Sequence, residues 1–173
     1  MKQNINIAWY LPRPKPDHYP GGMPLHCEGW LIDEAKSILR NPAPKILQLF
    51  AGMGKYGLRV DLKKEVIPDL IADAHYLPLN SQFDIVIADP PYSKDESKEI
   101  YGTPKPKYRK WTKEADRLLG PGGIMIVYHK ILMPNPNKKK YKCVRRVFIG
   151  TRANHRPRVA LFFRKLENHT LWD

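Results

Sequence analysis

Six short segments of this sequence are rich in apolar residues, and they limit the folds that the chain can adopt. Several are almost continuously apolar, a pattern typical of strands in a sheet that is covered on both faces. Strands of this kind, with helices between the early ones, indicate an α/β protein. The predicted strands are residues 45–50 (KILQLF), 69–74 (DLIADA), 84–89 (DIVIAD), 123–130 (GIMIVYHK), 143–150 (CVRRVFIG) and 159–165 (VALFFRK).

Two helices are predicted beside these strands. Residues 25–40 repeat apolar side chains at helical spacing until Asn41 and Pro42 end the run. Residues 112–120 form a shorter helix that leads into Pro121. With 173 residues, of which 42% are hydrophobic, we expect one compact domain that spans the whole chain.

Proline punctuates the sequence, with 17 of the 173 residues, about twice the usual share. Residues 11–24 (LPRPKPDHYPGGMP) can form neither a helix nor a central strand, because proline removes main-chain donors and restricts the residue before it. We therefore expect residues 1–24 to form an extended N-terminal arm.

The charge balance points to a polyanionic partner. Thirty Lys and Arg residues against 17 Asp and Glu residues give a net charge of +13, and such an excess favours nucleic acid through counterion release. The alternative is a basic surface that serves solubility. The sequence has no apolar segment long enough to span a membrane and no signal peptide, so we expect a cytoplasmic protein. Cys27 and Cys143 are interpreted as reduced thiols.

A glycine-containing loop and two acids follow predicted strands. In KILQLFAGMGKYG, Gly52 and Gly54 come after the first predicted strand and let the main chain approach a ligand closely. Asp61 stands where a further strand could end and could accept the two hydroxyls of a ribose. Asp73 ends another strand on the same ligand-binding edge of an open α/β sheet. Together these positions favour a nucleoside-containing cofactor, although a tight turn and surface acids would give the same pattern.

The sequence DPPY at Asp89, Pro90, Pro91 and Tyr92 ends a predicted buried strand. The two prolines restrict the backbone, so that a neighbouring carbonyl points in one direction. That carbonyl and the Asp89 carboxylate are two acceptors that match the two hydrogens of an exocyclic amine. Tyr92 offers a flat face on which a base lifted from its helix could stack. The alternative is a proline-rich strand exit with a capping aspartate.

The order FAGMG, VDL, ADA and DPPY resembles the class I S-adenosylmethionine-dependent methyltransferases, specifically those that methylate the exocyclic amine of adenine N6 or cytosine N4. PGGIMIVYHK is similar to their fifth strand and its preceding turn, and HYPGGMP is similar to the segment before their glycine loop. The resemblance covers about residues 18–165. It implies a Rossmann-like sheet that is mostly parallel with an antiparallel C-terminal strand.

The resemblance also implies roles for individual residues. It implies that the methionine end of the cofactor is lined by Phe50, Ala51, Gly52 and Gly54. It also implies that Asp61 binds the ribose of the cofactor and that its adenine edge is bound by Asp73 and Ala74. The target amine would be held by Asp89, next to the cofactor, and by the Pro90 carbonyl, with Pro91 completing the motif and Tyr92 stacked on the base. The cofactor would be S-adenosylmethionine, with S-adenosylhomocysteine as product, and no metal ion is expected.

Two features depart from the family pattern. Only Lys55 to Val60 separate Gly54 from Asp61, which is too short for the usual crossover helix. We therefore expect a shortened first crossover, made by a loop, and a short second strand. About 80 residues follow DPPY, so we expect no separate target-recognition domain.

Residues 93–111 are the predicted substrate loop, because cations there alternate with aromatic residues. Cations contact phosphates while rings stack on unpaired bases. The predicted substrate-binding residues are Tyr92, Tyr101, Arg109, Lys110 and Trp111. The alternative is a solvated lid with Trp111 packed on the core. Lys138 to Lys140, Arg152, Arg156 and Arg158 could extend this basic track.

Three functions are consistent with the sequence. The first is a DNA methyltransferase that makes N6-methyladenine or N4-methylcytosine, and we prefer it. The second is an RNA base amino-methyltransferase with the same chemistry, which the compact chain favours. The third is a non-catalytic nucleic-acid-binding module on the same fold, and it predicts the loss of cofactor residues that are in fact all present.

Overall fold

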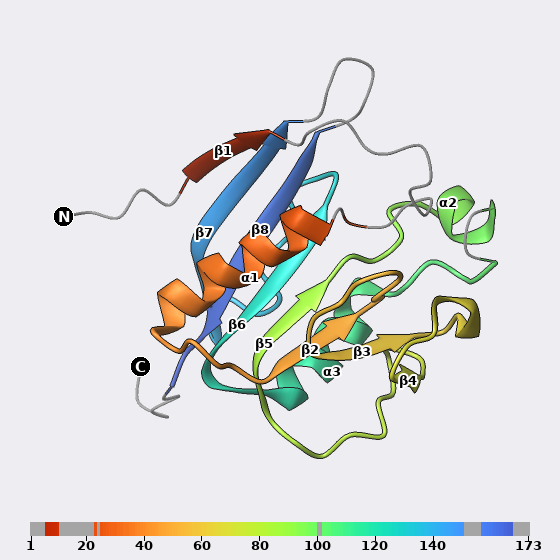
Figure 1. The fold of residues 1–173 in the computed structure, drawn as a ribbon, viewed down its shortest axis with the longest axis horizontal. Coiled ribbons are helices and arrows are strands. Elements are labelled where there is room, and N and C mark those ends of the chain that lie inside the picture. Colours follow the sequence, from red (N-terminus) through yellow and green to blue (C-terminus); the bar gives the residue numbers. More distant parts are fainter. Residues whose placement is uncertain (1–5, 11–22, 24, 100–101, 151–156, 168–173) are drawn as a thin grey trace.

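A single mixed sheet forms the centre of the molecule in a computed structural model that describes residues 6–10, 23, 25–99, 102–150 and 157–167. The sheet has eight strands in the order β1-β7-β8-β6-β5-β2-β3-β4 (Figure 1). The strands are β1 (Asn6–Tyr10), β2 (Ile46–Leu49), β3 (Leu58–Asp61), β4 (Leu70–Ile71), β5 (Phe83–Ala88), β6 (Leu119–His129), β7 (Tyr141–Gly150) and β8 (Arg158–Lys165).

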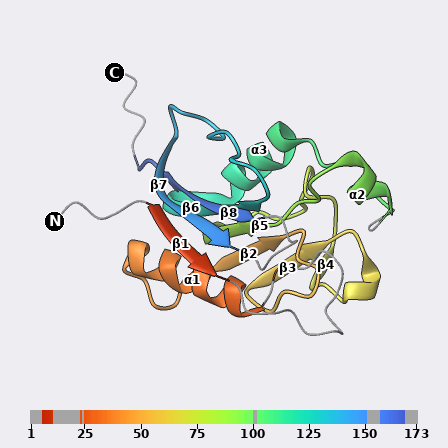
Figure 2. The ribbon, with the colours of Figure 1, turned by 90° about the horizontal axis from the view of Figure 1, so that it is seen from above.

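Helices cover both faces of this sheet. The helical elements are α1 (Leu25–Leu39), the 3-10 helix η1 (Lys64–Val66), α2 (Lys94–Glu99) and α3 (Tyr108–Leu118). Figures 1 and 2 place α1 on one face of the sheet and α3 on the other. Leu31 and Ile32 of α1 are fully buried against one face, and Trp111 and Leu118 of α3 are buried against the other. The fold is therefore the three-layer α/β arrangement expected from strands that are apolar on both sides.

The direction of strand addition reverses between β2 and β5. From β2 the chain adds β3 and β4 outward on one side, and then returns to place β5 on the other side of β2. In open α/β sheets a ligand binds at such a reversal, outside the carboxyl ends of the strands. The loop that follows β2 and the DPPY segment that follows β5 both lie at this position.

The predicted antiparallel C-terminal strand is confirmed. β8 lies between β6 and β7 and is antiparallel to both, whereas the other pairs in the sheet are parallel. The shortened first crossover is also present, because β2 leads to β3 through residues 50–57 without a helix.

The structure differs from the sequence prediction in several elements. Part of the predicted arm 1–24 is an edge strand, because β1 pairs in parallel with β7; residues 11–22 and 24 lie outside the described residues. The strand predicted at 69–74 keeps only the two residues of β4. Segment 93–111 is not one loop, since it contains α2 and the start of α3. α3 itself begins four residues before the predicted helix.

None of the helices among the described residues is long and apolar enough to cross a bilayer.

Candidate functional site

A cleft of about 870 Å³, counting the part open to solvent, lies at the carboxyl ends of β2, β3 and β5. Its walls include most of the residues that the sequence singled out for the cofactor and the amine. The predicted residues that line it are Phe50, Ala51, Gly52, Gly54, Asp61, Asp73, Asp89 and Pro91.

The loop after β2 turns sharply to form one wall of the cleft. Phe50 adopts a left-handed backbone conformation (φ 54°), which is uncommon for a residue with a side chain. Phe50 also meets Trp111 edge to face, with 5.8 Å between ring centroids. The Gly54 amide donates to the Ala51 carbonyl over 2.8 Å, closing the turn. The main chain of this loop is therefore held in place at the mouth of the cleft.

Asp61 at the end of β3 organises the same loop. Its Oδ2 accepts a hydrogen bond from the Gly52 amide over 2.9 Å, and its Oδ1 accepts one from the Lys63 amide over 2.9 Å. Each carboxylate oxygen can accept a further hydrogen bond. Asp61 thus lines the cleft while it connects the glycine loop to β3.

Asp73 is tied to a histidine that the sequence did not single out. Asp73 Oδ1 accepts from the main-chain amide of His75 over 2.9 Å and lies 2.6 Å from His75 Nδ1. His75 Nε2 in turn accepts a hydrogen bond from the amide of Lys107 over 2.9 Å. This chain joins the loop after β4 to the segment that precedes α3. Ala74, the other predicted adenine contact, is buried in the core and is not among the residues that line the cleft.

Asp89 follows β5 directly and lines the same cleft as the glycine loop. Burial raises the pKa of its carboxyl group to about 8, although the hydrogen bond from Tyr92 and the nearby Arg158 guanidinium both lower it. Pro91 lines the cleft beside Asp89, whereas Pro90 is buried behind it. The motif therefore presents a carboxyl group that is easily protonated to whatever occupies the cleft.

Tyr92 is enclosed rather than free to stack on a base. Its side chain is 8% exposed. Arg158 lies 4.9 Å from the ring centroid, Lys130 Nζ lies 5.2 Å from it, and His129 packs edge-on at 4.7 Å. The stacking role predicted for Tyr92 does not fit this packing. Its hydroxyl instead donates to Asp89 Oδ1 over 2.9 Å, so the residue orients the carboxyl group.

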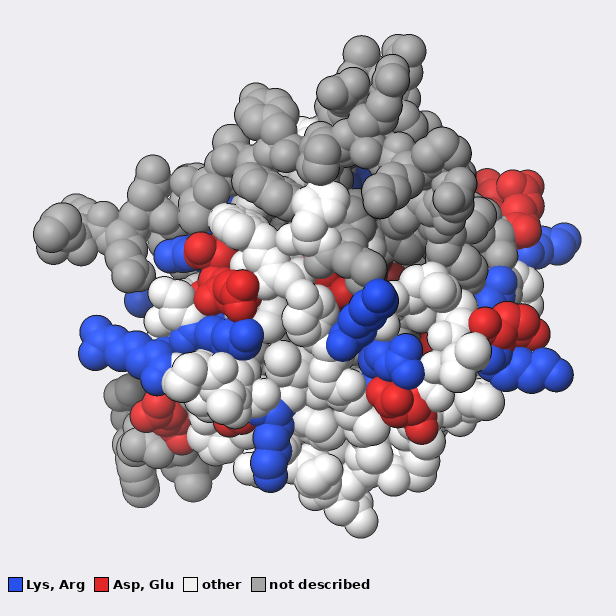
Figure 3. Space-filling model, in the orientation of Figure 1, with Lys and Arg blue, Asp and Glu red and all other residues white. Residues whose placement is uncertain are grey.

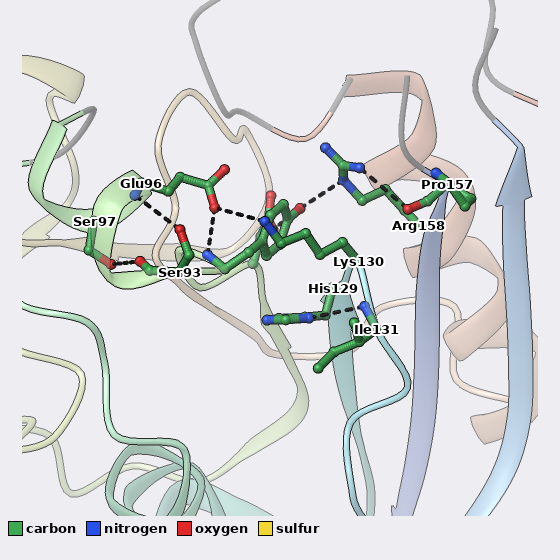
Figure 4. A network of polar contacts seen from close by, with 10 residues as sticks. Ser93, Glu96, Ser97, His129, Lys130, Ile131, Pro157 and Arg158 are labelled. Atoms are coloured by element: carbon green, nitrogen blue, oxygen red, sulfur yellow. Dashed lines mark hydrogen bonds and ion pairs between the residues drawn. The ribbon is translucent and has the colours of Figure 1, made fainter. Parts of the chain in front are cut away.

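A polar network connects this tyrosine to three other elements (Figure 4). Glu96 of α2 accepts the Tyr92 amide through Oε2 over 2.9 Å, and the same oxygen lies 3.7 Å from Lys130 Nζ. Arg158 of β8 donates through Nε to the Tyr92 hydroxyl over 3.2 Å. Burial, followed by nearby lysines, lowers the pKa of His129 to about 4, so this ring is neutral at physiological pH. The DPPY turn is thus fastened by residues far apart in the sequence.

The predicted basic and aromatic segment is only partly at the surface. Arg109 and Lys110 are exposed on the first turn of α3, and Lys110 Nζ lies 3.2 Å from the hydroxyl of exposed Tyr76. Trp111 is 1% exposed and packs in the core, so the alternative left open for it fits the structure and a base-stacking role does not. Tyr101 lies outside the described residues, as do Arg152 and Arg156.

Among the residues that the structure describes, the cations on the face that α1 covers do not form one continuous surface. Figure 3 shows cations and acids interspersed there. Lys140, one member of the proposed basic track, pairs with Asp116 over 2.9 Å. Arg158, another member, contacts Tyr92 at the site itself. Residue counts alone could not show that Lys140 pairs with an acid whereas Arg158 lies at the site.

Sequence reasoning missed two polar residues on the floor of the cleft. Glu28 of α1 and Gln48 of β2 both line it, and both are buried. Gln48 Nε2 donates to Glu28 Oε1. Burial raises the pKa of Glu28 to about 7. The available signal was a glutamine inside an otherwise apolar strand, which requires a partner.

The donor set fits an organic cofactor. Among the described residues, no group of three or more His, Cys, Asp or Glu side chains could hold a metal ion. The cleft combines a main-chain loop, carboxyl groups at or just after the ends of three strands, one further carboxyl group in the first turn of α1, and apolar walls. Such a site suits an elongated ligand with a hydroxylated sugar and a cationic end.

Comparison with known proteins supports this view of the fold. No protein-family model matches the sequence, and no curated protein sequence matches it. Solved structures do resemble it. The N-methyltransferase NodS from Bradyrhizobium japonicum, in complex with S-adenosyl-L-homocysteine, is 13% identical with a TM-score of 0.57, over 81% of this chain and 86% of that one.

Two further structures agree. An S-adenosylmethionine-dependent methyltransferase from Clostridium acetobutylicum is 12% identical with a TM-score of 0.56, over 84% of this chain and 93% of that one. TrmN from Thermus thermophilus is 21% identical with a TM-score of 0.52, over 76% of this chain and 48% of that one. The chain therefore has the Rossmann-like fold found in class I S-adenosylmethionine-dependent methyltransferases.

Proposed function

We propose that this protein is an S-adenosylmethionine-dependent methyltransferase that acts on the exocyclic amine of a nucleobase. One observation carries the proposal: Asp89 and the glycine loop line one cleft, at the carboxyl ends of the neighbouring strands β5 and β2, where the direction of strand addition reverses. A methyl donor on the loop would therefore face an amine held at Asp89. The FAGMG and DPPY motifs, in this order and at these strand ends, support the same assignment.

The residues present fit the proposed cofactor. Gly52 and Gly54 bring main chain to the mouth of the cleft, and Asp61 at the next strand end retains acceptor capacity for ribose hydroxyls. Asp73, two residues after β4, also lines the cleft and is the proposed partner of the adenine edge. When bound, the cofactor supplies a methyl group activated by its sulfonium. The chain supplies position, because transfer requires the amine to lie in line with the breaking bond.

Asp89 is the proposed amine-binding and proton-accepting group. The lone pair of a conjugated amine is a weak nucleophile, so an acceptor that holds an N–H helps the nitrogen to become pyramidal as it attacks. Burial disfavours the charged carboxylate in the free protein, as its pKa of about 8 indicates. A cationic donor nearby would favour the ionised form. Tyr92, through its hydroxyl, holds the carboxyl group in one orientation.

Nucleic acid is the proposed substrate, with DNA preferred to RNA. The net charge of +13 and the exposed Arg109 and Lys110 on the first turn of α3 support a polyanion. Because Tyr92 is enclosed, other groups would hold the target base. Phe50 and Pro91 are candidates, since both line the cleft. NodS and TrmN are similar to this chain in fold alone, so they do not discriminate between substrates.

The experiment that tests this function uses tritiated S-adenosylmethionine with plasmid DNA, single-stranded DNA or total RNA. We expect label in DNA, and nucleoside mass spectrometry should identify N6-methyladenine or N4-methylcytosine. Asp89→Ala should abolish transfer while S-adenosylhomocysteine still binds. Label in RNA alone would replace the proposed substrate with RNA. Failure to bind the cofactor would refute the enzyme and leave the non-catalytic module.

A further inference from the structure

The Asp73 carboxylate has one occupied oxygen and one open oxygen. Oδ1 accepts the main-chain amide of His75 over 2.9 Å and lies 2.6 Å from His75 Nδ1. Among the described residues, no hydrogen bond reaches Oδ2, and the side chain is 45% exposed where it lines the cleft. A carboxylate has acceptor capacity on both oxygens. Asp73 can therefore bind a ligand in the cleft through Oδ2 while it holds His75 through Oδ1.

The contacts of His75 define its tautomer. Nε2 accepts a hydrogen bond from the Lys107 amide over 2.9 Å, so this nitrogen carries no proton. In a neutral imidazole the proton is then on Nδ1, where it faces Asp73 Oδ1. Only 16% of the His75 side chain is exposed. Asp73 therefore keeps the ring in the tautomer and the orientation that accept from Lys107.

Lys107 connects the cleft to the proposed nucleic-acid contacts. It is the N-cap residue of α3, and its carbonyl accepts the amides of Lys110 and Trp111 over 2.9 and 3.2 Å. The Lys107 side chain makes no capping hydrogen bond. Arg109 and Lys110 lie in the helical turn that begins here. His75 therefore fixes the start of the turn that carries both cations.

The segment before Lys107 forms part of the cleft wall, because Thr103, Pro104 and Pro106 line the cleft. At its other end this segment is attached to α2, since the Thr103 amide donates to the Ser97 carbonyl over 3.0 Å. The two prolines have no amide hydrogen, so Lys105 is the only main-chain donor between these two attachments. The hydrogen bond to His75 therefore determines how the end of the wall nearest α3 lies against the cleft.

We propose, on the basis of the function proposed above, that His75 is a positioning residue that couples cofactor binding to nucleic-acid binding. A cofactor that contacts Asp73 Oδ2 restricts the carboxylate, which in turn restricts the His75 ring and the Lys107 amide. The cleft wall and the first turn of α3 are then ordered before nucleic acid binds. A ligand that binds to an already ordered site loses less entropy, so each ligand strengthens the binding of the other.

The test measures a coupling factor, which is the Kd of a fluorescent oligonucleotide without S-adenosylhomocysteine divided by its Kd at saturating S-adenosylhomocysteine. DNA and RNA of the same sequence are compared, and the tighter of the two is used. For the wild type we expect a factor of about 5 to 10, the effect of one hydrogen bond of ordinary strength. Calorimetry of S-adenosylhomocysteine with and without oligonucleotide should give the same factor, because such coupling is reciprocal.

Two substitutions each remove one contact of His75. His75→Gln places an amide oxygen near the position of Nε2, so it can still accept from Lys107 but has no donor at the Nδ1 position for Asp73. His75→Asn places an amide nitrogen near the position of Nδ1, so it can still donate to Asp73 but does not reach Lys107. Both variants should still bind each ligand by itself, and the coupling factor should fall to about 1 in both.

Hydrogen exchange of the Lys107 amide, measured by NMR, reports this connection directly. In the wild type, S-adenosylhomocysteine should slow the exchange, because the acceptor becomes more rigidly held. In His75→Asn the amide should exchange rapidly with or without the ligand. In His75→Gln the amide should remain protected, but the ligand should no longer change its rate.

A second contact between the loop after β4 and α3 provides a control that does not pass through Asp73. The Leu77 amide donates to Glu114 Oε1 over 2.9 Å, and Glu114 also pairs with Arg117. Glu114→Ala removes this contact but leaves Asp73 and His75 in place. It should lower the melting temperature without altering the coupling factor.

The outcomes separate this inference from the proposed function. If the wild-type factor is 1, or if either His75 variant keeps the wild-type factor, the inference is wrong while the methyltransferase proposal stands. If Glu114→Ala removes the coupling as fully as the His75 variants do, general packing of the loop on α3 carries it, and the inference is again wrong.

Two results would reach further. If the wild-type protein binds S-adenosylhomocysteine but neither oligonucleotide, nucleic acid is not the substrate and the inference is wrong with it. If the wild-type protein binds no S-adenosylhomocysteine, the proposed methyltransferase function itself fails.

Discussion

The hydroxyl of Tyr92 donates a 2.9 Å hydrogen bond to Oδ1 of Asp89, three residues earlier in the same turn. The two side chains act as one unit, because the bond lowers the pKa of a carboxyl group that burial raises to about 8. The ring itself is packed among His129, Lys130 and Arg158. The tyrosine of this motif therefore influences the amine site through its hydroxyl.

Tyr92→Phe should shift the pH dependence of methyl transfer. Without the hydroxyl donor, the pKa of Asp89 rises further, so the ionised carboxylate forms only at higher pH. We expect the acidic limb of the kcat profile to move upward by about one pH unit, with transfer at pH 7 reduced about 10-fold. S-adenosylhomocysteine affinity should be retained.

Tyr108→Phe provides the matched control for that substitution. The Tyr108 hydroxyl donates to the carbonyl of Pro134, away from Asp89, so its loss should leave the pH profile in place. A Tyr92→Phe profile that overlays the wild-type profile would show that the hydroxyl does not tune Asp89.

Gly54→Ala should impair cofactor binding. The added methyl group would lie within 2.5 Å of three Gln48 side-chain atoms, so either the glycine loop or Gln48 must move. We expect S-adenosylhomocysteine affinity to fall at least about 10-fold, measured by calorimetry. Gly120→Ala is the comparison, because its Cβ would make only ordinary contacts of 3.5 Å or more. Equal affinities in both variants would contradict the geometry of this loop.

Arg109→Ala combined with Lys110→Ala should weaken nucleic-acid binding without destabilising the fold. Both side chains are exposed on α3, and exposed substitutions of this kind change stability by about 0.5 kcal/mol or less. Loss of phosphate contacts should reduce the slope of log affinity against log salt by about 1 to 2. The readout is a titration with fluorescent oligonucleotide at several salt concentrations.

A control removes the same number of charges elsewhere. Lys36→Ala with Lys142→Ala changes α1 and the start of β7 at two residues that do not line the cleft. If both double variants lower the salt slope equally, the effect reflects net charge and the α3 residues do not form a binding site.

Asp89→Asn should stabilise the protein most at high pH. The folded state raises the pKa of this group from 3.8 to about 8, so between these values the unfolded chain releases a proton that the folded protein keeps. The resulting free-energy cost of folding grows as pH rises through this window. Asparagine removes it, so melting temperatures should exceed wild type by about 4 to 8 °C at pH 8, equivalent to about 2 kcal/mol.

At about pH 3 or below the same comparison should give little difference, because Asp89 is then protonated in most molecules of both the folded and the unfolded state. Asp33→Asn, at an exposed carboxylate, should give a small difference at every pH. A stabilisation that does not depend on pH would mean that burial of the Asp89 charge is not its cause.

The sequence determined the class of fold and the edge of the sheet that carries the site. Apolar segments such as 84–89 could be recognised because a strand covered on both faces needs apolar side chains on both sides. Since parallel strands end at one edge, the glycine loop and Asp89 could be expected to meet there. The short connection between Gly54 and Asp61 predicted a crossover without a helix. In the structure this crossover contains no helix.

Only the tertiary structure decided which residues complete that site. Glu28 reaches Gln48 from 20 positions away, and Arg158 reaches Tyr92 from 66 positions away. The same packing buries Trp111, which the sequence could equally place at the surface. Local patterns determine the period of a strand or a helix, because that period depends on near neighbours. They do not determine which side chains from distant elements share a buried space, because that depends on how the helices pack on the sheet.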